Sequence, residues 1–230
     1  MDHTLPQLAS SLLDLIASTE GPQGYVTIFG NNQRKLPRPI TTMTIDEVIA
    51  AQRGWTKSYG SSAAGRYQCM RATLQGLLAD PASGFRGSDV YNANCQDRIG
   101  FALLRRRGYD SFVAGRLSVT AFGLRLAQEW ASLPVLADCQ GAHRRVRRGE
   151  TFYAGDKLNK VGMKPERVES ALALKNSISA NRLAPPVALE PAQAPAPAPR
   201  PAPVAPQPVP PSKPVSNGLF HGLLSMLQRG

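Results

Sequence analysis

The sequence predicts a mostly helical α+β domain over residues 1–183, followed by a segment of a different composition. In most of that range, apolar residues recur at spacings of three and four, the period of amphipathic helices. One run, YVTIF at residues 25–29, is instead β-branched and aromatic, and the turn signal Gly30-Asn31-Asn32 follows it. Many short helices with one small β-hairpin region are typical of the α+β class.

The helices are predicted in order from apolar spacing and from the residues that begin or end them. The first contains Leu5, Leu8, Leu12, Leu15 and Ile16. It should end at Ala17 or Thr19, because a glycine- and proline-containing stretch follows. A second helix should begin at Thr44, whose hydroxyl and the Glu47 carboxylate have the spacing of a capping box. Further helices are predicted at Tyr67–Leu78, Asn94–Arg107, Ser118–Leu133 and Pro165–Ala180.

Two segments of different composition follow residue 183, and the first of them is too rich in proline to belong to a core. Residues 184–217 repeat Ala-Pro and predict a semi-rigid polyproline-II linker. Residues 218–230, GLFHGLLSMLQRG, predict a short amphipathic helix. This tail is too short to span a bilayer. It suits the interface of an anionic membrane, and docking to another protein or to the main domain is the alternative.

Composition excludes several classes of protein. No apolar run has the length of a membrane-spanning helix, and the N-terminus lacks the basic start of a signal peptide. Cys69, Cys95 and Cys139 are far apart and predict reduced thiols rather than a disulfide or zinc site. No nucleotide-binding or zinc-protease motif occurs, so we expect neither cofactor nor metal.

The formal charge of +11 favours a polyanionic partner. The arginines concentrate in residues 98–148, where few aromatic side chains accompany them. A specific nucleic-acid site would add a recognition helix or stacking aromatics. Attraction to an anionic cell wall or to lipopolysaccharide is the better interpretation, with an ordinary solvated surface and nucleic-acid binding as alternatives.

Two short motifs contain candidate catalytic and binding residues. In STEG, residues 18–21, Glu20 lies at the end of an apolar helix, where burial and the helix dipole both disfavour its charged form. That environment suits a general acid in glycosidic cleavage. In SSAAGRYQ, residues 61–68, small residues are followed by a cation, an aromatic ring and an amide. These last three groups are the ones that a sugar-binding site needs. For each motif taken alone, an ordinary surface helix end or an ordinary loop is the favoured interpretation.

Together, these motifs resemble those of the phage lambda-type endolysin family, within the lysozyme-like superfamily. The resemblance covers residues 8–175. It rests on STEG, YVTIFG and SSAAGRYQ, and continues through Gln96-Asp97, FALLRRRG at 101–108, WASLP at 130–134 and TFYAGD at 151–156. It implies a lysozyme-like domain whose substrate is the glycan strand of peptidoglycan. The implied reaction cuts this strand between N-acetylmuramic acid and N-acetylglucosamine. Residues 31–60 do not align clearly with the family's hairpin.

The resemblance also implies residue roles. Glu20 matches the catalytic glutamate of lytic transglycosylases, which first protonates the leaving oxygen and then helps the muramic 6-hydroxyl to attack its own anomeric carbon. Tyr67 and Gln68 match the cleft motif and are expected to position the sugar. Tyr153 is expected to stack on it or to belong to the core, and Ser18 to orient Glu20 or only to bond its own helix. Arg66 is expected to contact substrate or to pair with a carboxylate, and Trp130 to lie in the core.

Two reaction mechanisms are compatible with Glu20 as the acid: lytic transglycosylation and hydrolysis. A hydrolase needs a second carboxylate near Glu20, but Asp46 and Glu47, the next acids, already have a capping role, and no acid lies between Gly21 and Ile45. This favours a one-carboxylate transglycosylase over a two-carboxylate muramidase. A non-catalytic wall-binding or virion-associated protein is a further alternative. We expect a monomer that stays in the host cytoplasm until a holin-type pore releases it to the periplasm and cell wall.

Overall fold

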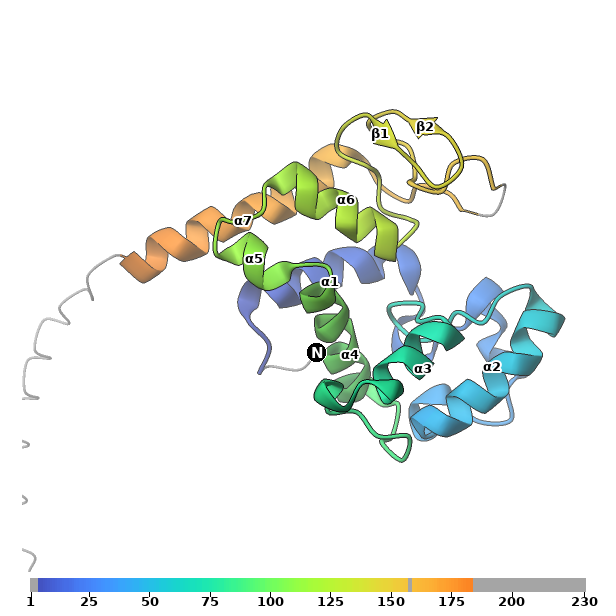
Figure 1. The fold of residues 1–230 in the computed structure, drawn as a ribbon. Helices are drawn as coiled ribbons and strands as arrows, with labels where there is room; N and C mark the ends of the chain where they lie inside the picture. Colours follow the sequence, from blue (N-terminus) through green and yellow to red (C-terminus); the bar gives the residue numbers. More distant parts are fainter. Residues whose placement is uncertain (1–3, 157–158, 184–230) are drawn as a thin grey trace, which may run out of the picture. The chain divides into compact units, whose positions relative to one another are not determined.

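The computed structural model describes residues 4–156 and 159–183, and the predicted linker and tail lie outside them. The described part is mostly helical with one small sheet (Figure 1), so the predicted α+β class is confirmed. Its α-helices are α1 (Gln7–Glu20), α2 (Ile45–Tyr59), α3 (Arg71–Ala79), α4 (Ala93–Arg106), α5 (Tyr109–Val113), α6 (Val119–Glu129) and α7 (Pro165–Leu183). Short 3₁₀ segments cover Gly24–Val26, Phe29–Lys35, Ile40–Thr42 and Pro81–Ser83. Strands β1 (Cys139–Gln140) and β2 (Arg145–Val146) are antiparallel, with Cys139 opposite Val146.

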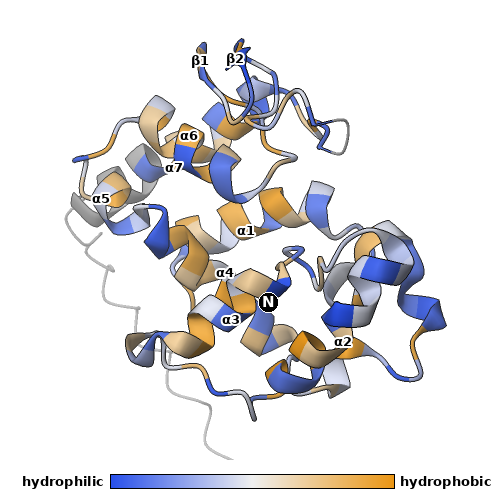
Figure 2. Ribbon diagram, turned by 45° about the vertical axis from the view of Figure 1, so that its right-hand side comes forward, coloured by the Kyte–Doolittle hydropathy of each residue, from blue (hydrophilic) through white to orange (hydrophobic). Residues whose placement is uncertain are grey.

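Helix α1 lies at the centre of the domain because it is apolar over a wide face. Leu12, Leu13 and Ile16 are almost fully buried, and α1 packs against both α4 and α7. Burying each such side chain contributes about 1.5–3 kcal/mol before the entropy of ordering is subtracted. Figure 2 shows the apolar and polar stripes of α1 and α4. The position of α1 places its last residue, Glu20, between two groups of elements.

One group consists of α2, α3 and the 3₁₀ segment Phe29–Lys35, which packs against α2. The predicted capping box begins α2: the Glu47 amide donates to Thr44 Oγ1 at 3.2 Å, and the Thr44 amide donates to Glu47 Oε2 at 2.7 Å. The other group contains α6, α7 and the sheet. Figure 1 shows the two groups on opposite sides of the C-terminal end of α1.

The predicted hairpin at residues 25–32 is wrong. Gly24, Gly30 and Asn31 have φ values of 72°, 68° and 56°, which turn the chain into 3₁₀ segments instead of extended strands. The β-branched run makes only an isolated bridge, between Ile28 and Ala64. The sheet of the described residues lies at 139–146, where each strand is two residues long and therefore too short for an alternating pattern.

Among the helix boundaries that differ from the prediction, two move residues of the sequence motifs. The helix predicted from Tyr67 begins at Arg71, because Gln68 has a φ of 47° and cannot be helical. The helix predicted to reach Leu133 ends at Glu129, because Trp130 is extended, with φ −120° and ψ 105°. Both corrections place motif residues in loops beside Glu20, and not on helices.

Candidate active site

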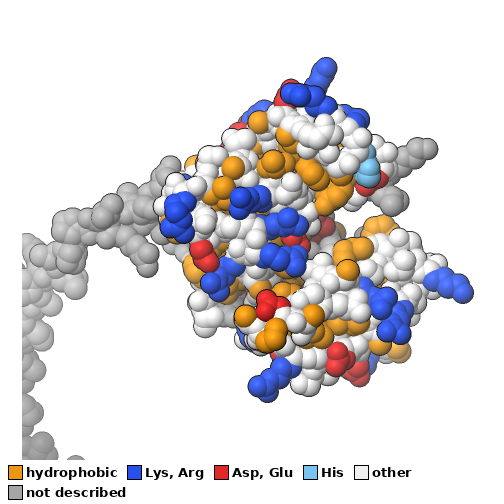
Figure 3. Space-filling view, in the orientation of Figure 1, with side chains coloured by type: hydrophobic (Ala, Val, Ile, Leu, Met, Phe, Trp, Pro, Cys, Tyr) orange, Lys and Arg blue, Asp and Glu red, His pale blue; other side chains and the backbone are white. Residues whose placement is uncertain are grey.

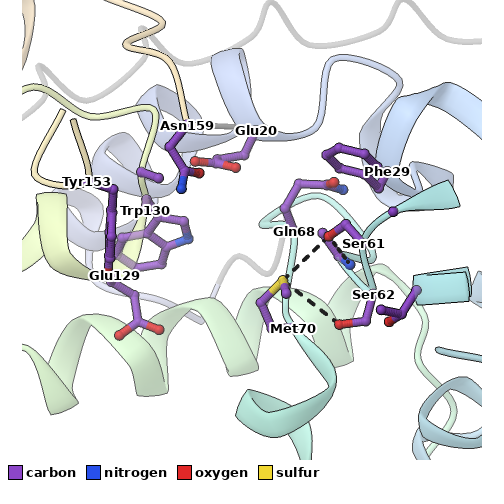
Figure 4. Close-up of a pocket in the computed structure, with 14 residues that line it drawn as sticks. Glu20, Phe29, Ser61, Ser62, Gln68, Met70, Glu129, Trp130, Tyr153 and Asn159 are labelled. Carbon is purple, nitrogen blue, oxygen red and sulfur yellow. Dashed lines mark hydrogen bonds between the residues drawn. The ribbon is translucent and has the colours of Figure 1, made fainter. Parts of the chain in front are cut away.

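A pocket of about 470 Å³ lies at the end of α1, and its size is in the range of small-molecule sites. Figure 3 shows the surface hollowed between the part that carries the sheet and the part that carries α2. The walls come from segments far apart in the sequence: Glu20, Phe29, Thr56, Gly60, Ser61, Ser62, Ala63, Gln68, Met70, Glu129, Trp130, Ala131, Tyr153 and Asn159. In Figure 4, Phe29 and Gln68 lie across the pocket from Trp130 and Tyr153.

Glu20 places a partly buried carboxyl group in the wall of this pocket. Its Oε1 accepts a hydrogen bond from Ser132 Oγ at 2.6 Å and a longer one from the Ser132 amide at 3.4 Å. Burial raises the pKa of Glu20 above its ordinary value, and the two Ser132 donors oppose this effect without cancelling it. Both donors use Oε1, so the proton of the acid form belongs on Oε2. A carboxyl group in this state can donate a proton at a pH where an exposed glutamate is ionised.

Ser132 itself is held by a second hydroxyl. Thr19 Oγ1 lies 2.9 Å from Ser132 Oγ and 3.1 Å from the carbonyl oxygen of Ile16. The backbone of Ser132 is also fixed, because its carbonyl accepts a hydrogen bond from the Gly162 amide at 2.8 Å. Glu20 is therefore oriented by the segment after α6. The predicted contact from Ser18 is wrong: Ser18 Oγ donates to the Leu15 carbonyl of its own helix at 2.6 Å.

Ser132→Ala is expected to slow turnover about tenfold and to raise the pKa of Glu20 further. The lost hydroxyl stabilises the charged carboxylate, and a hydrogen bond to a charged group is worth about 1.5–3 kcal/mol. Since the acid form must be present for proton donation, the fall in activity with rising pH should move to higher pH. The pH profile of turnover measures this shift, and Ser132→Thr, which keeps a hydroxyl, should restore the original profile. A profile unchanged in Ser132→Ala would contradict the role.

The two sequence motifs meet directly behind Glu20. A Cβ placed on Gly21 would lie only 2.4 Å from the carbonyl oxygen of Arg66. Gln96 holds the same loop from the other side, since its Oε1 accepts from the Arg66 amide at 2.8 Å and its Nε2 donates to the carbonyl of Tyr25 at 3.0 Å. The glycine of STEG and the amide of Gln96 therefore fix the AGRYQ loop against the end of α1.

Arg66 and Tyr67 do not reach the pocket, which corrects their predicted substrate contacts. Tyr67 is buried and donates to Asp97 Oδ1 at 2.6 Å. Arg66 forms an ion pair with Asp14, and its guanidinium lies 3.6 Å from Asp97, so the predicted pairing with a carboxylate is the alternative that is confirmed. Tyr25 completes the cluster, and burial together with the nearby Asp97 charge raises its pKa to about 12. The cluster is an internal support for the AGRYQ loop.

Gln68 and Tyr153 do line the pocket, as predicted for substrate-binding residues. The left-handed backbone of Gln68 turns its side chain toward the loop, where Nε2 donates to the Gly65 carbonyl at 2.8 Å. Tyr153 is held from behind, because its hydroxyl donates to the Gln128 carbonyl at 2.7 Å. Trp130 is buried as predicted, with Nε1 donating to the Tyr67 carbonyl at 3.2 Å, but it also forms part of the pocket wall.

Several pocket residues were not found from the sequence. Phe29 and Met70 are 41% and 46% exposed, unusual for large apolar side chains, and they provide an apolar surface within the pocket. The Met70 sulfur accepts hydrogen bonds from the hydroxyls of Ser61 and Ser62 (Figure 4). The WASLP segment pointed to the correct stretch of chain, but nothing in its spacing distinguishes Ser132 as the partner of Glu20.

Glu129 is a second carboxylate in the pocket wall. Its side chain is only 7% exposed and is bridged by two guanidinium groups, with Arg106 Nη2 at 2.9 Å and Arg107 Nε at 2.6 Å. The two cations compensate its charge and occupy its oxygens. Glu20 and Glu129 therefore lie in different environments: one carboxyl is partly buried beside hydroxyl groups, and the other is fixed in an ionic cluster.

Within 4–156 and 159–183, no three His, Cys, Asp or Glu side chains gather as metal ligands. In the same part of the chain, none of the helices offers the apolar length that a bilayer crossing requires.

Comparison with protein families, curated proteins and solved structures found no match to this chain.

Proposed function

We propose that this protein cleaves the glycan strands of peptidoglycan between N-acetylmuramic acid and N-acetylglucosamine, as an endolysin acting by lytic transglycosylation. The observation that carries the proposal is the environment of Glu20. Burial raises the pKa of this carboxyl group, and Ser132 holds its Oε1 in a pocket lined by polar and aromatic side chains. One protonatable carboxyl group with a fixed orientation is what this reaction needs. The motifs that resemble the lambda-type endolysins surround it.

In the proposed reaction, Glu20 Oε2 gives its proton to the glycosidic oxygen as the bond to the muramic anomeric carbon breaks. The glutamate is then a carboxylate, and the two Ser132 donors at Oε1 stabilise it. It next removes the proton of the muramic 6-hydroxyl, whose oxygen bonds to the anomeric carbon. The products are a 1,6-anhydro-muramic end and a free N-acetylglucosamine hydroxyl. The proton returns to Glu20, and no water is consumed.

A two-carboxylate muramidase is the second candidate, and Glu129 is the observation that favours it. Inverting and retaining glycosidases need a second acid to activate water or to attack the sugar. Glu129 lines the same pocket as Glu20. The ion pairs with Arg106 and Arg107 weigh against this role, because they occupy the oxygens that would have to contact water or sugar.

Product analysis is expected to find 1,6-anhydro ends. When purified peptidoglycan is digested, the released muropeptides should be one water lighter than those from a hydrolase, as mass spectrometry can measure directly. Glu129→Gln should keep the same products, although it weakens charge-assisted hydrogen bonds to Arg106 and Arg107 and should lower stability by about 1–3 kcal/mol. Reducing muramic ends from the wild type, together with loss of cleavage in folded Glu129→Gln, would establish the hydrolase instead.

A further inference from the structure

Basic side chains continue the pocket wall along α2. Thr56 and Gly60 line the pocket, and Arg53 and Lys57 are exposed. Gly60 follows the last residue of α2, and at 3.6 residues per turn the three helical positions Arg53, Thr56 and Lys57 fall within about 100° of the helix circumference. The face of α2 that forms the pocket therefore runs directly into a pair of cations.

A second pair comes from the segment beside α2. This 3₁₀ segment begins with Phe29 in the pocket wall and ends with the exposed residues Arg34 and Lys35. Its end lies against the last turn of α2, because the Lys35 ammonium is 5.5 Å from the centre of the Tyr59 ring. Together we call these cations the α2 rim, which comprises Arg34, Lys35, Arg53 and Lys57.

The α2 rim is not neutralised within the part of the chain that the structure describes. None of its four cations pairs with a carboxylate there, whereas Arg106, Arg107, Arg144 and Arg148 each do. The acids of α2, Asp46 and Glu47, lie at its opposite end, and Glu47 is already paired with Arg38 at 2.6 Å. Across the pocket, Glu129 is bridged by arginines. The rim is therefore a source of positive potential at the edge of the pocket.

We propose that the α2 rim binds the carboxylates of the peptide stems carried by the glycan strand, an inference that rests on the proposed function. A muramic residue must sit beside Glu20 if its anomeric bond is to be cut there. The stem is attached to that residue and carries free carboxylates, so it must leave the pocket near one of its edges. The edge formed by α2 and the neighbouring 3₁₀ segment offers four cations that pair with no carboxylate of the described residues. Stem-bearing strands should therefore be preferred over bare glycan.

The test compares one charge-removing double variant with a matched control. Arg53→Gln with Lys57→Gln removes two rim charges and keeps good helix formers. Arg86→Gln with Arg116→Gln removes the same charge from exposed positions that do not line the pocket. The substrates are uncrosslinked strands with their stems and the same strands after an amidase has removed the stems. Catalytic efficiency, kcat/KM, and binding affinity are measured on both at several salt concentrations.

The wild type and the control should prefer stem-bearing strands, and the rim variant should lose about three- to tenfold of that preference, as expected for two exposed ion pairs. The loss should shrink as salt screens the charges. An equal decrease on bare strands, or an equal decrease in the control, would overturn the proposal. If the wild type cleaves neither substrate, the proposed function fails. The binding comparison still tests the rim in that case, and equal affinity of rim variant and wild type for stem-bearing strands would contradict it.

Discussion

Glu20→Gln is expected to abolish most of the cleavage activity while leaving the fold intact. The amide keeps an oxygen that can accept from Ser132 Oγ, but it has no acidic proton to give to the leaving oxygen. General acid catalysis contributes typically 10²- to 10⁴-fold, so turnover should fall by at least about a hundredfold. Release of muropeptides from purified peptidoglycan measures the loss, and circular dichroism checks the fold.

The same substitution should change stability in a direction that depends on pH. Burial raises the pKa of Glu20 in the folded protein above its value in the unfolded chain. A raised carboxyl pKa gives stability that is present below the unfolded pKa and is lost as pH rises through the folded pKa. Glutamine does not titrate, so thermal stability of Glu20→Gln relative to the wild type should increase from acidic toward neutral pH.

Glu47→Gln is the matched control for this experiment. Glu47 lies at the start of α2, outside the pocket, and bonds the Thr44 amide and Arg38. Its replacement should therefore leave cleavage close to the wild-type rate. Near-normal lysis by Glu20→Gln, or an equal loss in Glu47→Gln, would refute the assignment of Glu20 as the acid.

Helices were the part of the fold that the sequence could predict, for reasons visible in single elements. The apolar spacing of α1 continues over four turns, and Thr44 with Glu47 forms a cap that depends only on neighbours in sequence. The run at residues 25–29 has the composition of a strand, but a strand needs a partner of matching length. The glycines on both sides turn the chain away, and only one bridge forms.

The sequence predicted those residues of the site that belong to short motifs. Glu20, Gln68 and Tyr153 reach the pocket. Tyr67 is buried instead, because the left-handed backbone of Gln68 turns the two adjacent side chains in different directions. The motif alone does not indicate which of the two faces the core. Ser132 could not be found at all, since its contact with Glu20 joins positions 112 residues apart.

Gly21→Ala is the second large effect that we expect, and it tests why the STEG and AGRYQ motifs occur together. Gly21 has φ −125° and ψ 67°, so its backbone does not itself require glycine. The constraint is space, because the added Cβ would lie 2.4 Å from the Arg66 carbonyl oxygen and 2.8 Å from its Cα. These atoms belong to the backbone of a loop that Gln96 holds, so they cannot rotate away as a side chain would.

Forced separation of α1 from the AGRYQ loop should cost about 1–3 kcal/mol of unfolding free energy, the usual range for overpacking. It should also displace Glu20 relative to Gln68, and a shift of about 1 Å at a catalytic group can cost about a hundredfold in rate. Thermal unfolding and turnover at a temperature where the variant is folded measure the two effects separately.

Gly76→Ala provides the matched comparison. Gly76 lies in α3, where a Cβ would meet nothing within 4 Å. The same chemical change should there stabilise the helix by about 0.5–1 kcal/mol, because alanine loses less backbone entropy than glycine. If Gly21→Ala were as stable and as active as Gly76→Ala, close approach of the two motifs would not be what requires glycine after Glu20. A loss of activity in a variant that remains folded would instead show that the distance between these motifs sets the position of the acid.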